Sequence, residues 1–174
     1  PAYALKPAPC TGAQPGCTTA TTLTSILNTA VYGVASNTSG TMTVAVGVGT
    51  YSTMAYSTNG TTWNQVGKLI FSTAGKGILW SDNKFVAVGN GTNSIAYSYD
   101  GINWIGKGTP MLYGNSIAWN GSTYLVVGYS TCDVNYSFTC TPLSLTSSDG
   151  INWDNWGSAQ NGMFNWENSG NYTS

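Results

Sequence analysis

The chain has 174 residues, a length that fits one domain or two small ones. Only 6% of its residues are charged, all five basic residues are lysines and histidine is absent, whereas an ordinary soluble domain carries about 25% charged residues. This composition excludes nucleic-acid binding through a basic patch, histidine-based acid–base catalysis and zinc sites with imidazole ligands.

Hydrophobic residues make up 41% of the chain and aromatic residues 13%, which is more buriable surface than a disordered chain contains. No apolar run approaches the roughly 18 residues that a membrane-spanning helix needs. The chain begins at Pro1 with neither Met nor a signal-like segment, which indicates a processed form or a fragment. We therefore expect a folded protein without a membrane span.

Residues 1–30 are a Thr- and Pro-rich extension that precedes the repeats described below. Cys10 and Cys17 lie close together in it, so we predict a local disulfide between them. Residues 21–27 are strand-like and belong to no repeat. This spare strand either completes a sheet of its own chain or adds to the unfinished sheet of a neighbouring chain.

One sequence pattern recurs three times between residues 31 and 174. We predict first strands over 31–35, 77–80 and 116–119, and Val-rich second strands over 44–47, 85–89 and 124–128. A third strand follows and ends in a turn, where serine precedes an Asn-Gly or Asp-Gly pair and tryptophan comes after it. The turn residues are Ser57, Asn59, Gly60 and Trp63, then Ser98, Asp100, Gly101 and Trp104, then Ser148, Asp149, Gly150 and Trp153.

These turns suit tight hairpins, because both residues of an Asn-Gly or Asp-Gly pair can adopt positive φ and the Ser, Asn and Asp side chains can bond turn amides. The tryptophan then lies on the next strand and covers the hairpin. No ten-residue stretch shows helical periodicity. The sequence thus predicts an all-β repeat domain over 31–174 with three four-stranded units, and a fourth that starts at 163–166 and stops at Ser174.

The turn sequences 57–63, 98–104 and 148–153 resemble the Asp-box, or BNR, repeat of sialidase-like β-propellers. They are a short-looped variant, because a residue between Asp and Gly is missing, and the first copy has Asn59 in place of Asp. The resemblance implies propeller-type blades in which the Asp-box is a structural turn, remote from any catalytic centre. It does not imply sialidase activity, since that family binds the substrate carboxylate through arginines and this chain has none.

Three blades do not close a propeller, which usually has about four to eight. Either the chain is a fragment of a longer propeller, or several chains close one ring, or the ends of chains pair head to tail. The incomplete fourth unit and the spare N-terminal strand favour head-to-tail pairing, which generates a fibre when the contact does not close.

Cys132 and Cys140 lie on a loop inserted in the third copy and form the second predicted disulfide. Two disulfides indicate an oxidising, extracellular setting, including a virion or cell surface. Six sequons are possible glycosylation sites, although about four would arise by chance in a chain so rich in Asn, Ser and Thr. The sequon residues are Asn37, Asn59, Asn90, Asn120, Asn135 and Asn171.

Few side chains are left for chemistry. Asp154 and Glu167 are the only carboxylates without an evident structural role, and we predict neither a catalytic residue nor a metal or cofactor site. Trp156 is the only tryptophan outside the repeat register, which makes it a candidate for stacking on a sugar.

The leading hypothesis is a non-enzymatic extracellular structural subunit of a surface filament, sheath or virion fibre. It would assemble with copies of itself through β-strand complementation. The alternative is an oligomeric lectin-like propeller that binds carbohydrate through Trp or Tyr and Asn or Asp.

Overall fold

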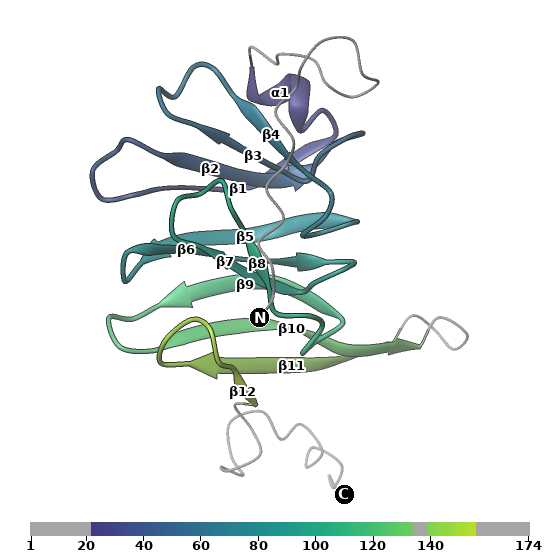
Figure 1. Cartoon of the computed structure of the whole chain (residues 1–174). Coiled ribbons are helices and arrows are strands. Elements are labelled where there is room, and N and C mark those ends of the chain that lie inside the picture. Colours follow the sequence, from purple (N-terminus) through teal and green to yellow (C-terminus); the bar gives the residue numbers. More distant parts are fainter. Residues whose placement is uncertain (1–21, 134–138, 156–174) are drawn as a thin grey trace, which may run out of the picture.

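The computed structural model describes residues 22–133 and 139–155. They form three four-stranded antiparallel units that stack on one another in chain order (Figure 1). Blade 1 contains β1 (Ala30–Ser36), β2 (Thr43–Val48), β3 (Met54–Ser57) and β4 (Asn64–Gly67). Blade 2 contains β5 (Ala74–Ser81), β6 (Lys84–Asn90), β7 (Ile95–Ser98) and β8 (Ile105–Gly106). Blade 3 contains β9 (Tyr113–Trp119), β10 (Tyr124–Asp133), β11 (Thr139–Ser147) and β12 (Asp154–Asn155).

Each blade is a meander in which consecutive strands pair. A single bridge between Asn90 and Tyr113 joins blades 2 and 3 into one curled sheet. The predicted all-β fold with three four-stranded units is therefore confirmed. The fourth copy predicted from residue 163 lies outside the described residues.

Side chains alternate between the two faces of each blade. We call the face toward the next blade in the chain the forward face, and the opposite one the backward face. In β2, Val44 and Val46 lie forward in the cluster shared with blade 2, and Ala45 lies backward. In β6, Val88 lies forward and Ala87 backward. The short Val-Ala-Val phrase of the repeat thus supplies both faces of a blade at once.

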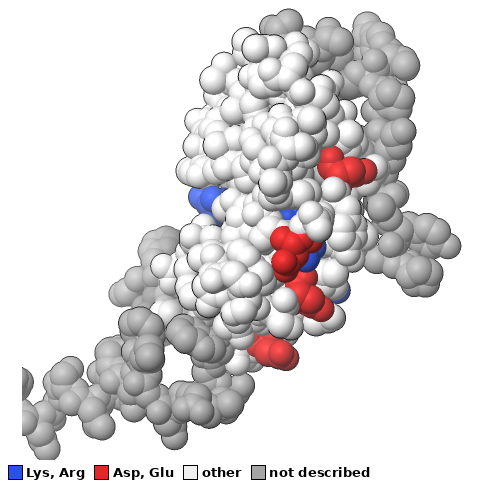
Figure 2. Space-filling view, turned by 90° about the vertical axis from the view of Figure 1, so that its left-hand side faces the viewer, with Lys and Arg blue, Asp and Glu red and all other residues white. Residues whose placement is uncertain are grey.

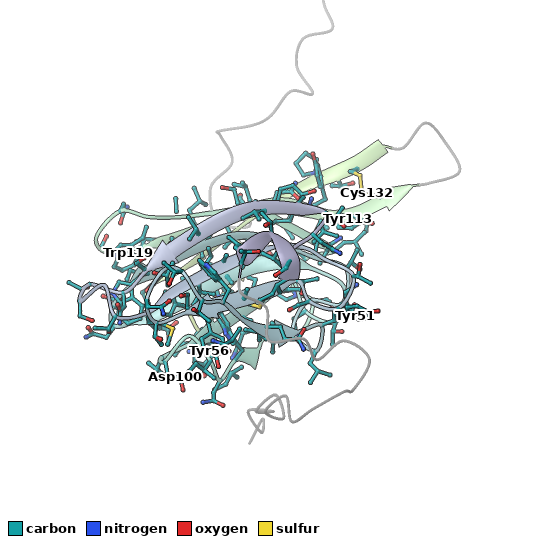
Figure 3. All side chains as sticks on the ribbon, turned by 90° about the horizontal axis from the view of Figure 1, so that it is seen from above. Tyr51, Tyr56, Asp100, Tyr113, Trp119 and Cys132 are labelled. Carbon is teal, nitrogen blue, oxygen red and sulfur yellow. A yellow bond between two sulfur atoms is a disulfide. The ribbon has the colours of Figure 1, made fainter. Side chains whose placement is uncertain are left out.

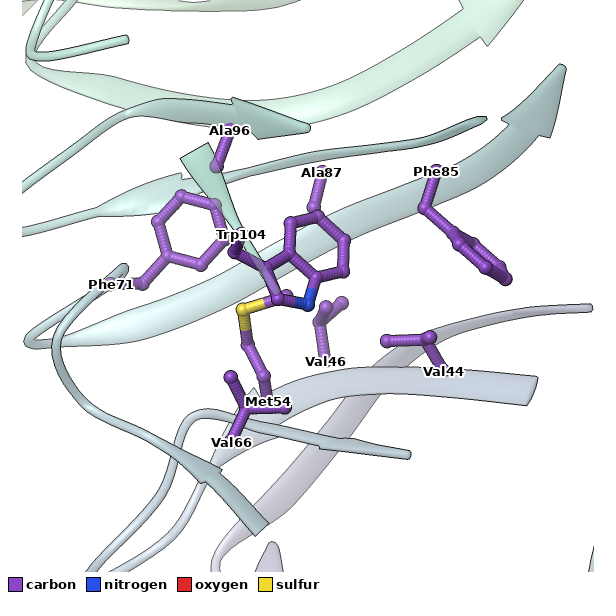
Figure 4. Packing of buried hydrophobic residues seen from close by; sticks show 9 residues of the cluster. All are labelled: Val44, Val46, Met54, Val66, Phe71, Phe85, Ala87, Ala96 and Trp104. Atoms are coloured by element: carbon purple, nitrogen blue, oxygen red, sulfur yellow. The ribbon is translucent and has the colours of Figure 1, made fainter. Parts of the chain in front are cut away.

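An apolar core fills the space between blades 1 and 2 (Figure 4). Trp104, which comes directly before β8, is only 2% exposed and packs against the forward face of blade 1. Its Nε1–H donates to the carbonyl of Gly101 at 3.2 Å, so the indole is buried without leaving its polar atom unpaired. The core members are Val44, Val46, Met54, Val66, Phe71, Phe85, Ala87, Ala96 and Trp104.

A second core lies between blades 2 and 3 and is built at the equivalent repeat positions. It differs from the first in containing Tyr124, whose ring is buried and whose hydroxyl reaches a polar cluster described below. The members are Val86, Val88, Ile95, Met111, Tyr124, Val126 and Leu145. Burying each large apolar side chain contributes about 1.5–3 kcal/mol, so these two cores hold the stack together.

The segment before blade 1 is a short helix, α1 (Leu23–Ile26), and the spare strand predicted over residues 21–27 is wrong. Its apolar residues Leu23, Ile26 and Leu27 stand at i, i+3 and i+4, the spacing that gives a helix one apolar face. Ile26 and Leu27 pack with Ala45 and Trp63 on the backward face of blade 1. The predicted disulfide of the extension, Cys10–Cys17, lies outside the described residues.

Charge is sparse on the surface. On the face seen in Figure 2, acidic side chains lie in a row with lysine beside them, and most of that face is uncharged. No helix within 22–133 or 139–155 is long and apolar enough to cross a membrane.

Candidate functional site

The three repeat turns share one hydrogen-bond pattern. In the second turn, the Ser98 Oγ accepts the N–H of Gly101 at 2.9 Å and donates to the Asp100 carboxylate at 3.0 Å. The same carboxylate oxygen accepts the N–H groups of Ile102 and Asn103 at 2.9 and 2.7 Å. Each turn is thus closed by its own side chains, as the sequence predicts.

Three details of the predicted turns are wrong. The serine of the third turn is Ser147, whose Oγ accepts the N–H of Gly150 at 2.8 Å, and Ser148 is exposed. Ser147 stands two residues before Asp149, as Ser98 does before Asp100, which is the spacing that this bond requires. In the Asn-Gly and Asp-Gly pairs of these three turns only the glycine has positive φ. The Asn or Asp side chain closes the turn by accepting the backbone N–H groups of later residues. In addition, each tryptophan comes one residue before the fourth strand rather than on it.

The two aspartates of the turns are held ionised. Four hydrogen bonds lower the pKa of Asp149 and together outweigh burial, which raises it. The strongest comes from the Asn152 N–H, followed by those from the Ile151 N–H, the Asn152 side-chain amide and the Ser147 hydroxyl. Burial raises the pKa of Asp100, but four hydrogen bonds together outweigh it, so that this pKa is also lowered. They come from the backbone and side chain of Asn103, the Ile102 N–H and the Ser98 hydroxyl. Both carboxylates are therefore acceptors committed to structure, with no protonated form to act as an acid near neutral pH.

A buried polar cluster joins blades 2 and 3. The Tyr124 hydroxyl lies 2.7 Å from the Ser81 Oγ and 3.3 Å from a carboxylate oxygen of Asp82. Lys84 is only 6% exposed, its Nζ lies 3.8 Å from the Asp82 carboxylate, and it stands over the Tyr124 ring. Burial raises the pKa of Tyr124, with the charge of Asp82 adding to it, so the phenol stays protonated. The cluster is a satisfied structural network rather than a reactive site.

The β10–β11 hairpin extends beyond the rest of blade 3 as an arm, residues 130–133 and 139–142 (Figures 1 and 3). The predicted disulfide Cys132–Cys140 is present and joins residues that pair directly across the two strands. The Thr131 and Thr141 side chains hydrogen-bond to each other at 3.3 Å across the same ladder. Two cross-strand links therefore stabilise a hairpin that pairs with no third strand of the described residues.

Both edges of the arm lack a neighbouring strand among the described residues. On one side β9 pairs with β10 only as far as Tyr129, and on the other β12 pairs with β11 only at Leu145 and Thr146. In blade 1, by contrast, β4 pairs along β3 from Met54 to Tyr56. Backbone N–H and C=O groups along the arm edges are thus open to another strand.

A groove of about 430 Å³ lies at the base of the arm, between blades 2 and 3. Among the described residues its lining contains no charged side chain, and it is bordered by Asn90, Pro110, Tyr113 and Ser130 among others. The Oδ1 of Asn90 is buried and has no hydrogen-bond partner in the part of the chain that the structure describes. That oxygen is itself inaccessible, so it is an unpaired acceptor inside the protein and is not presented to the groove.

The other predicted residues of the described ranges do not line this groove. Asn59 and Asn120 are exposed on turns, where their Oδ1 atoms accept backbone N–H groups. The Asn37 side chain bonds to Thr41 and to the Met42 N–H. Asn135, Asn171, Trp156 and Glu167 lie outside the described residues, so glycosylation and sugar stacking stay predictions there. No three His, Cys, Asp or Glu side chains of the described ranges lie close enough to hold a metal ion.

No protein-family model and no curated protein matches the chain. Among solved structures, it resembles a chain of the crystal structure of a nidogen/laminin complex, with a TM-score of 0.52 and 14% sequence identity. The alignment covers 72% of this chain and 47% of that one, so the protein spans about half the length of its match. The nidogen match is to a β-propeller region, and at this identity the likeness shows the fold alone. This chain is built of propeller-type blades.

Proposed function

We propose that this protein is a non-enzymatic extracellular structural subunit of a surface filament, sheath or virion fibre. Its chains join by β-strand addition along the arm, and its blades are Asp-box-like repeats. The observation that carries the proposal is the arm with its two open edges. A lone two-stranded hairpin is at best marginally stable in water, and exposed edges template pairing with another chain.

Two further features support this proposal. The Cys132–Cys140 disulfide fits an oxidising, extracellular compartment. The low content of charged residues, 6%, leaves little repulsion to oppose close contact between like chains. Because one arm has two open edges, each chain can bind two neighbours, which is the minimum for a filament.

The test compares assembly of the full chain with that of a variant in which both arm edges carry charge. Thr131→Lys with Thr141→Lys places two lysines on the exposed arm, where like charges of paired arms repel. We expect negative-stain microscopy and light scattering to show filaments or large oligomers for the wild type and monomers for the variant. Ser148→Lys, on an exposed residue at the other end of β11, is the matched control and should assemble normally. A wild type that stays monomeric at high concentration contradicts the proposal.

A second candidate function is carbohydrate binding by an oligomeric, lectin-like form. The groove favours it, because its lining among the described residues is uncharged and includes the Tyr113 ring, which suits a neutral sugar. A glycan array tests it: specific binding that is lost in Asn90→Ala or Trp156→Ala supports a lectin, and an array without binding removes this candidate.

A further inference from the structure

The forward face of blade 3 is open among the described residues. Val127 is 42% exposed, whereas Val46 and Val88 at the same repeat position are fully buried. Leu125 is half-buried, whereas its counterpart Val86 is fully buried. Two blades therefore have this face covered by the blade that follows, and the third presents apolar side chains to whatever comes next in the chain.

In blades 1 and 2, the chain that directly follows the outer strand folds over the forward face. After β4, Phe71 is fully buried against blade 1, and its carbonyl accepts a hydrogen bond from the Thr53 Oγ1 at 2.7 Å. After β8, Met111 is 2% exposed in the core of blade 2, and its N–H lies 3.4 Å from the Ser94 Oγ. The same route is thus used twice in succession.

After β12 the chain continues from residue 156 to residue 174. This segment contains large apolar residues at Trp156, Met163, Phe164 and Trp166 among Ser, Asn and Gly, with no lysine and one acid. We propose that residues 156–174 bind the forward face of blade 3 within their own chain, with their apolar side chains over Leu125 and Val127.

The chemistry of the face fits this occupant better than a complete blade of a second copy. Where blades 1 and 2 carry Met54 with Tyr56 and Ile95 with Tyr97, blade 3 carries Ser144 and Thr146. A face that is half apolar and half hydroxyl suits a short segment of a few apolar residues in a polar context. Leu143 stands where blades 1 and 2 have the hydroxyls of Thr53 and Ser94, and it packs against the core between blades 2 and 3. We therefore expect Leu125 and Val127, and not a hydrogen bond at this position, to hold the segment.

The other end of the stack is already closed in this way. Ile26 and Leu27, which precede the first repeat, cover the backward face of blade 1 and bury Trp63 to 8% exposure. Stacked repeats require such caps, because their terminal units have no neighbour. With the forward face of blade 3 covered in the same way, contacts between chains fall to other surfaces. The inference does not depend on the arm binding a second copy.

A photocrosslinking amino acid, benzoylphenylalanine, placed at position 127 of the full chain tests this assignment. The experiment uses the Thr131→Lys, Thr141→Lys background, so that assembly through the arm does not add contacts. We expect crosslinks to residues 156–174 in a product of monomer mass, with a yield that does not change over a tenfold dilution. The same group at Tyr99, a residue that is 61% exposed on β7's turn, is the control and should not reach that segment.

Three results overturn the proposal: crosslinks between chains, crosslinks to residues 1–21, and the absence of any crosslink in a folded variant. If the group at position 127 prevents folding, the same experiment at the half-buried Thr146 decides the question. Loss of arm-mediated assembly is read separately, by light scattering of the wild type. The two proposals can therefore fail independently.

Discussion

The two interfaces between blades use the same backbone positions with different chemistry. A Cβ at Gly101 would meet Met42 and Val44, whereas one at the equivalent Gly150 would meet Lys84 and Tyr124. The first interface is apolar throughout its core, and the second contains an ion pair and a buried phenol. The repeat therefore fixes where a turn glycine packs closely against the preceding blade. The side chain that the glycine contacts can be polar where its polar atoms find hydrogen-bond partners.

The tryptophans of the two interfaces differ in whether their buried N–H group has a hydrogen-bond partner. Trp104 is almost fully buried and its Nε1–H has a partner, whereas Trp153 is only partly buried and its Nε1 is a buried atom without one in the described ranges. The interface between blades 1 and 2 is thus the better satisfied of the two. The predictions below test this difference.

The largest effect is expected at Trp104. Trp104→Ala removes a buried ring from the centre of the first core and should lower the free energy of unfolding by about 3–5 kcal/mol. Trp153→Ala is the matched control at the second interface and should cost less, because its ring is partly exposed and its N–H is already unpaired. Guanidinium denaturation followed by circular dichroism measures both. Equal losses would show that the two interfaces are energetically alike.

A smaller effect is expected from the buried phenol. Tyr124→Phe removes the 2.7 Å hydrogen bond to Ser81 and leaves a buried hydroxyl without that partner, which should cost about 1–3 kcal/mol. Lys84→Met places at this position the residue that the first interface uses, and should change stability by less than about 1 kcal/mol, because Asp82 is half-exposed and such pairs are weak. If Lys84→Met costs as much as Tyr124→Phe, the ion pair rather than the phenol stabilises the second interface.

The repeat made the blades predictable. Strand positions, the hydrogen bonds of the first two turns and the buried tryptophans at 63 and 104 follow from one pattern that occurs three times, because the same local sequence forms the same local structure. The segment 21–27 had no second copy to compare. Its threonines favour a strand locally, but packing of its apolar side chains against blade 1 stabilises a helix instead.

The candidate site is less visible in the sequence. The Cys132–Cys140 spacing predicts a disulfide, but not that the hairpin carrying it outgrows its neighbours, because that depends on where β9 and β12 stop pairing. Nothing local marks Lys84 as buried, since it is covered by Tyr124 and Gly150, which are distant in sequence. The correct turn serine, Ser147, was available from its spacing to Asp149.

The smallest predicted effect is a difference in how the stability that each turn contributes depends on pH, between the first turn and the other two. In the folded state Asp100 and Asp149 have pKa values below the roughly 3.9 of an unfolded aspartate, so they stabilise the fold above that pH. This stabilisation is lost as the pH falls through the folded-state values. Asn59 makes the same bonds to the N–H groups of residues 61 and 62 without a charge, so the first turn should not respond.

The measurement is the urea midpoint between pH 6 and pH 2, a range in which a chain without histidine titrates only through carboxyl groups. Asp100→Asn with Asp149→Asn should flatten the fall in the midpoint at low pH, and Asn59→Asp should steepen it. The increase in acid sensitivity from Asn59→Asp should be the smaller of the two changes. Thr62 stands where Asn103 and Asn152 donate a side-chain amide to the second carboxylate oxygen, so the first turn lacks that hydrogen bond. A double variant as acid-sensitive as the wild type would place the relevant carboxyl groups outside the turns. In that case the three turns would be equivalent, and charge would add nothing to what the asparagine already achieves.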